Sequence, residues 1–168
     1  MFRAMDWLLA PFEYELTTWH PLAVHAPVVL VPLGALGACV HAFTGRPRVR
    51  AGLLVWFAVT ALAAWWAMRT GKALYEGVEG TPIVEELIAQ HRTTAAWVLR
   101  LTIALVLLLA GLSAWRRWRR ASWRKANSVL RLGRDPLWIR AVVVLLAFVA
   151  ALLVVYTGHV GGVMVWGR

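Results

Sequence analysis

Four long apolar stretches, separated by short polar segments, dominate the chain and predict its main helices. They lie at about residues 21–43, 51–70, 82–117 and 136–158. Each contains a run of about 20 residues that is long enough to cross the hydrocarbon core of a bilayer as a helix. None alternates strictly between apolar and polar positions, as a strand of a membrane barrel does. Since lipid offers no partners to open backbone groups, the pattern predicts an all-α integral membrane protein, a four-transmembrane-helix bundle.

The composition supports a single membrane domain over residues 1–168. Of the 168 residues, 61% are hydrophobic and only 15% are charged, whereas soluble domains are about 45–50% apolar. The lone cysteine, Cys39, excludes an intramolecular disulfide and the C-x-x-C-H haem attachment motif. Any haem is therefore expected to be bound non-covalently. Residues 1–18 carry acidic side chains and Pro11, so they predict an interfacial segment on the outer face rather than a cleavable signal peptide.

Charge is distributed unevenly between the two sides of the predicted bundle. The loops at 44–50 and 116–136, taken through Arg140, hold 12 of the 18 Lys and Arg residues. Seven of the eight acidic residues lie on the other side. The positive-inside rule makes both basic loops cytoplasmic and places both termini on the outer, periplasmic side of a bacterial inner membrane. Topology thus explains the net charge of +10, and no nucleic-acid partner is expected.

The histidines are the candidate functional residues. His20, His25, His91 and His159 fall near the predicted outer face, whereas His41 falls at the opposite face and is interpreted as an ordinary interface residue. Ionisable residues in or beside membrane spans are costly, and neutral imidazole is the commonest metal ligand. We expect haem b between an axial pair formed by His25 and His91. His20 and His159 are alternative ligands, contacts of the cofactor edge, or ligands of a second cofactor.

Two further features bear on this site. His25 lies about 140° around the first helix from His20, so both cannot face one point unless the helix is distorted, and Pro27 and Pro32 favour distortion. Arginines on the histidine side are candidates to neutralise haem propionates, and the one inside a span needs a counter-charge. These arginines are Arg69, Arg92 and, within the span, Arg100.

Two motifs give the chain a family resemblance. The opening WHPLAVHAPVVLVPL and the ending TGHVGGVMVWG resemble the bacterial membrane family called domain of unknown function 2231. That family has four membrane helices with histidines on one side. Some of its members look like domains joined to cytochrome c modules, so the resemblance implies an association with redox proteins. The resemblance carries over His20, His25, His91, His159, Gly161 and Gly162 as candidate site or motif residues.

Three functions fit these observations. The first is a membrane b-type cytochrome that exchanges electrons near the outer face with a quinol, a periplasmic cytochrome or a copper protein. The second is a non-haem protein that binds copper or zinc through three or four of the same histidines. The third is a structural subunit of a larger membrane complex. A homo-oligomer is compatible with all three, and whether the site is catalytic stays open.

Overall fold

The structure, a computed structural model, is an all-helical bundle whose four helices are long and apolar enough to cross a membrane. It describes residues 19–75, 82–124 and 134–166, so the segment expected at residues 1–18 lies outside the described residues. The helices are α2 (His20–Thr44), α3 (Pro47–Tyr75), α4 (Pro82–Arg124) and α5 (Leu137–Trp166). The predicted multi-pass membrane fold is confirmed.

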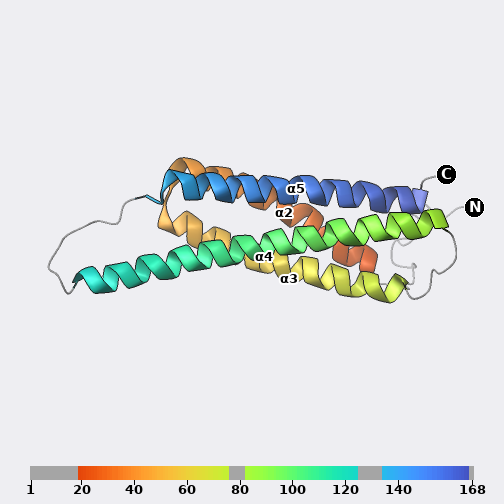
Figure 1. Cartoon of the computed structure of the whole chain (residues 1–168), viewed down its shortest axis with the longest axis horizontal. Helices are drawn as coiled ribbons and strands as arrows, with labels where there is room; N and C mark the ends of the chain where they lie inside the picture. Colours follow the sequence, from red (N-terminus) through yellow and green to blue (C-terminus); the bar gives the residue numbers. More distant parts are fainter. Residues whose placement is uncertain (1–18, 76–81, 125–133, 167–168) are drawn as a thin grey trace, which may run out of the picture.

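The helices run alternately up and down, and each packs against two neighbours (Figure 1). α2 and α4 each contact α3 and α5, so α2 and α4 lie on one diagonal of the bundle and α3 and α5 on the other. One end holds the start of α2 and α4 and the end of α3 and α5, and we call it the histidine end. The opposite end, where α2 meets α3 and α4 leads toward α5, is the basic end. α4 has 43 residues, about 65 Å of helix, and projects past the other helices at the basic end (Figure 1).

The observed helices are longer than the apolar stretches that predicted them. α3 begins at Pro47 rather than near residue 51, because α2 ends at Thr44 and the next residue, Gly45, has a left-handed φ of 58° that turns the chain at once. The Gly45 N–H donates to the His41 carbonyl at 2.7 Å and closes the last turn of α2. α5 continues to Trp166 instead of ending near residue 158. Hydropathy detects only the apolar part of a helix, and polar or glycine-rich turns extend it at either end.

α2 stays continuous through its two internal prolines. The interior of the bundle holds two apolar clusters, one toward the basic end around Phe57, Leu105 and Leu109, and one around Val31 and Val98. The outer faces instead carry large exposed apolar side chains. In water such a surface would be an aggregation liability, whereas hydrocarbon solvates it at no cost. Examples are Leu36, Phe43, Leu62, Leu107 and Leu152.

Candidate functional site

His20 is held at the histidine end by the neighbouring helix. Its Nδ1 lies 3.0 Å from the carbonyl oxygen of Ala67 and 3.1 Å from the Thr70 hydroxyl, both on α3. A carbonyl only accepts, so Nδ1 carries the proton and donates it. In the neutral ring Nε2 then keeps its lone pair, which is the arrangement found in histidines that bind metals.

His91 is oriented in the same way from the other side of the bundle. Its Nδ1 donates to the carbonyl oxygen of Thr157 on α5 at 3.0 Å. The Thr157 hydroxyl is turned back to the Leu153 carbonyl at 2.7 Å, so it does not compete for the ring. His91 therefore also has the Nδ1–H tautomer in its neutral form, with an unprotonated Nε2.

The two rings meet across the bundle axis. Their centroids are 6.4 Å apart with an angle of 77° between the ring planes. His20 comes from α2 and His91 from α4, which are diagonal helices that make no direct backbone contact. The side chains thus bridge the centre of the bundle, where four-helix proteins build their metal and cofactor sites.

Glycines on the other diagonal make room for both rings. A Cβ at Gly71 on α3 would lie 2.8 Å from His20 Cε1, and a Cβ at Gly161 on α5 would lie 3.2 Å from His91 Cε1. Both rings therefore rest on bare backbone. Gly158 and Gly162 of the same α5 motif have nothing within 4 Å of such an atom. Within this motif, the close approach of a side chain to bare backbone is therefore at Gly161.

The structure separates the other two predicted histidines from this pair. His25 is exposed, and its Nδ1 donates to the carbonyl of Pro21 in its own helix. His159 is also exposed, on α5. The expected pairing of His25 with His91 stays a prediction, but the ring that lies against His91 is that of His20.

The three predicted arginines lie on exposed positions. The Arg69 guanidinium lies 5.6 Å from the ring centroid of Trp65, and that of Arg100 lies 4.8 Å from the centroid of Trp97. The charge of Arg100 is therefore met by an aromatic face on its own helix, where a carboxylate was expected. Arg92 is exposed one position after His91.

A site with three or four protein ligands is not assembled in the part of the chain that the structure describes. No group of three His, Cys, Asp or Glu side chains there is placed to hold one metal ion. The copper or zinc alternative required at least three of the histidines to converge. The described residues instead bring together two imidazoles, which could serve as two protein ligands on opposite sides of one bound metal.

The basic end contains a second polar cluster that the sequence did not reveal. Asp135 precedes α5, and its side chain is fully buried. One carboxylate oxygen, Oδ1, accepts from Arg50 of α3 and Arg116 of α4, while Oδ2 lies 3.3 Å from Nε2 of His41 of α2. Arg140 of α5 donates to the Ala42 carbonyl beside them. We call these side chains the Asp135 network, and it joins all four helices.

This network corrects the interpretation of His41 as an ordinary interface residue, because His41 is 0% exposed. The sequence did hold one signal, since Asp135 is the single acid among the basic residues of that side. A lone carboxylate amid arginines is expected to pair with them, but the sequence cannot tell which ones. The network contains three arginines and one aspartate. It joins the helices at the end of the bundle opposite the histidine pair, so its role is structural.

Comparison with known proteins places the chain in a family. The profile of the family described as a predicted membrane protein (DUF2231) matches residues 17–168. The chain belongs to this family. No curated protein and no solved structure matches the chain.

Proposed function

We propose that this member of the DUF2231 family is a membrane b-type haem protein whose axial ligands are His20 and His91. The observation that carries the proposal is the pair of imidazoles from diagonal helices, with centroids 6.4 Å apart. Each has its Nδ1 committed to a backbone carbonyl of a neighbouring helix, which leaves Nε2 as the donor atom. Haem held by His20 and His91 would supply one-electron exchange.

The separation of the rings fits two ligands of one metal. Metal–nitrogen bonds of about 2 Å, with about 1 Å more from each nitrogen to its ring centre, put two opposed imidazole centroids about 6 Å apart. The observed 6.4 Å agrees with that value. Edge-to-face ring pairs also occur at this distance. What favours a shared metal is that the two Nδ1 atoms donate to carbonyls of α3 and α5, which leaves both Nε2 atoms unprotonated. The chain's own part is to fix the tautomer and direction of each ring before any cofactor is bound.

The position of the pair indicates the partners. Under the positive-inside rule, the basic end faces the cytoplasm of a bacterial inner membrane, so the histidine end faces the periplasm. Among the described residues the one fully buried histidine, His41, lies at the opposite end against Asp135. We therefore propose exchange near the outer face, with a quinol or a periplasmic redox protein, rather than conduction across the bilayer.

The test is an optical spectrum of the purified protein, oxidised and then reduced with dithionite. A sharp Soret band with narrow α and β bands on reduction is expected for the wild type. His20→Ala and His91→Ala should each lose the low-spin spectrum, and added imidazole should restore it in part, because a free ligand can occupy the vacated space. His159→Ala is the matched control and should keep the wild-type spectrum.

The same set of variants decides between the two pairings. If His25→Ala abolishes the spectrum and His20→Ala does not, the axial pair is His25 and His91. If the wild type carries copper or zinc by metal analysis and shows no haem bands, the non-haem alternative replaces the proposal. A sample with neither haem nor metal, prepared with haem supplied during expression, would refute both and leave the structural-subunit hypothesis.

A further inference from the structure

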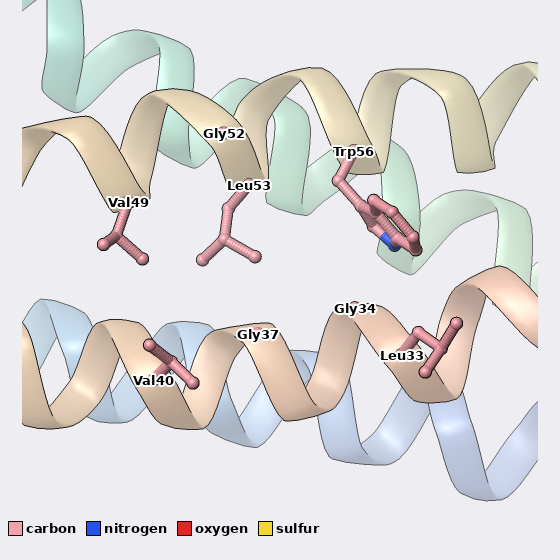
Figure 2. A pocket seen from close by; sticks show the side chains of 8 residues that line it. All are labelled: Leu33, Gly34, Gly37, Val40, Val49, Gly52, Leu53 and Trp56. Carbon is pink, nitrogen blue, oxygen red and sulfur yellow. The ribbon is translucent and has the colours of Figure 1, made fainter.

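A groove with a volume of about 440 Å³ runs along the outside of the bundle between α2 and α3, toward the basic end (Figure 2). This volume lies within the range of about 300–1,000 Å³ that is typical of small-molecule sites. Its walls are apolar, and three of its lining residues are glycines, whose bare backbone forms part of its surface (Figure 2). The residues that define it are Gly34, Gly37, Val40, Val49, Gly52 and Trp56.

The three glycines of the groove have different surroundings. A Cβ at Gly34 would lie 2.8 Å from Phe57, and one at Gly37 would lie 2.9 Å from Leu53, so these two allow α3 to approach α2. A Cβ at Gly52 would meet nothing within 4 Å. Gly52 therefore leaves open a space that any larger residue would fill. Gly52 is exposed, so this space is open to the surroundings of the bundle and can admit an apolar chain.

One end of the groove is fixed by a hydrogen bond. The indole Nε1 of Trp56 donates to the Leu30 carbonyl at 2.9 Å, which holds the ring across the two helices. The other end, beyond Val40 and Val49, leads to the short connection between α2 and α3. A chain-like apolar molecule would thus lie parallel to the helices, with its polar end at the connection.

The connection is positively charged. Arg46 and Arg48 are both exposed there, and Arg48 lies one helical turn before Gly52, on the same face of α3. Within the described residues neither arginine makes an ion pair, whereas Arg50 is buried against Asp135 and unavailable. The carboxylate of Asp135 is itself enclosed, so no acidic group of the described chain faces the mouth of the groove.

We propose that this groove is a binding site for an anionic phospholipid, with one acyl chain along Gly34, Gly37 and Gly52 and the phosphate at Arg46 and Arg48. An apolar trough that ends at a basic membrane interface matches the two parts of such a lipid. A second copy of the chain is disfavoured as the occupant. A parallel dimer packed on the groove would bring Arg46 and Arg48 against the same residues of its partner.

The first test measures lipid bound to the purified protein by native mass spectrometry, titrating phosphatidylglycerol and, separately, phosphatidylcholine. The wild type should bind phosphatidylglycerol more tightly. Gly52→Leu should lower the affinity at least tenfold, because its side chain occupies the space of the acyl chain. Gly111→Leu on α4 is the matched control, because Gly111 is also an exposed helical glycine with nothing within 4 Å of an added Cβ.

The second test concerns the head group. Removal of a basic residue near an anionic lipid surface costs about fivefold in affinity, so Arg46→Gln with Arg48→Gln should lower phosphatidylglycerol binding about 25-fold. Phosphatidylcholine binding should hardly change. The control is Arg117→Gln, which removes an exposed arginine of α4 at the same end.

Three results would overturn the proposal. The first is equal binding of the two lipids by the wild type, and the second is an equal loss in Gly52→Leu and Gly111→Leu. The third is a change from dimer to monomer in Gly52→Leu with lipid binding intact, which would assign the groove to a second copy. Circular dichroism of each variant checks that a loss of binding does not come from unfolding.

Discussion

Removing the charge of Asp135 is expected to destabilise the bundle more than any single change at the histidine end. The side chain is 0% exposed, and the two arginines that donate to it, Arg50 and Arg116, are each 7% exposed. Breaking a buried pair by deleting one partner costs about 3–5 kcal/mol, because the remaining charge is left buried without compensation. Here the deletion affects two arginines on two helices. We therefore expect Asp135→Ala to lower the free energy of unfolding by about 3–5 kcal/mol.

Asp135→Asn separates charge from hydrogen bonding. The amide oxygen can still accept from an arginine, and the backbone N–H of residue 135 still donates to the Gly45 carbonyl at 3.1 Å. Hydrogen bonds between two neutral groups, or with only one charged partner, are weaker than those joining two ions. The loss should therefore be smaller for Asn than for Ala, about 2–3 kcal/mol.

The assay is unfolding in mixed micelles of increasing dodecyl sulfate fraction, followed by far-ultraviolet circular dichroism. Glu86→Gln is the control, because Glu86 is an exposed carboxylate at the other end of the bundle. It should change stability by less than about 0.5 kcal/mol.

A compensated variant tests the reasoning itself. Replacing Asp135 with Leu together with Arg50→Met and Arg116→Met removes every uncompensated charge of the trio. Replacing a whole buried ionic cluster with apolar residues is often neutral or stabilising, so most of the lost stability should return. Two results would show that the Asp135 network does not hold the helices together. One is that Asp135→Ala and Asp135→Asn both unfold at the same dodecyl sulfate fraction as the wild type. The other is that the triple variant is less stable than Asp135→Ala.

Two glycine substitutions, Gly71→Ala and Gly45→Ala, test close contacts elsewhere in the bundle by the same unfolding assay, and Gly158→Ala is the control. Gly71→Ala would place its Cβ 2.8 Å from the His20 ring and should cost about 1–3 kcal/mol by overpacking. Gly158→Ala has open space around it and should be neutral or stabilising by up to about 1 kcal/mol. Equal stability of the two variants would contradict the packing of the His20 ring on α3. Gly45→Ala should cost about 1–2 kcal/mol, because φ is 58° there and the added Cβ would also meet Arg134 at 2.8 Å; a wild-type unfolding curve would show that the turn adapts.

The spans could be predicted from the sequence because lipid forces a simple rule on the chain. Runs of about 20 apolar residues must be helices, and their number and order follow directly. Helix ends were less predictable, since Pro47 and Arg48 extend α3 through polar residues that hydropathy counts against a span. The continuation of α5 past Gly158 escaped for a similar reason, because glycine is a weak helix former that packing can still hold in a helix.

The pairing at the site could not be predicted, because it depends on how each helix is rotated about its own axis. Helix geometry separates His20 from His25 by about 140° of rotation, but the sequence does not say which of the two faces the bundle axis. The sequence also does not determine which two of the four helices lie diagonally opposite each other. Gly71 was the available clue, since a glycine inside a helical pattern often marks a close backbone approach.

The two polar layers of the bundle differ in chemistry in a way that separates fold from function. The Asp135 network is ionic, buried and shared by four helices, so it resists rearrangement. Each ring of the His20–His91 pair has one hydrogen bond to a backbone carbonyl, with the Thr70 hydroxyl also near His20, and rests on glycine, so few interactions are lost when either ring is removed. The layers are about 30 Å apart along α2, because 21 residues separate His20 from His41. Sites so distant contribute additively to stability, so the effect of a change at one end can be measured without interference from the other end.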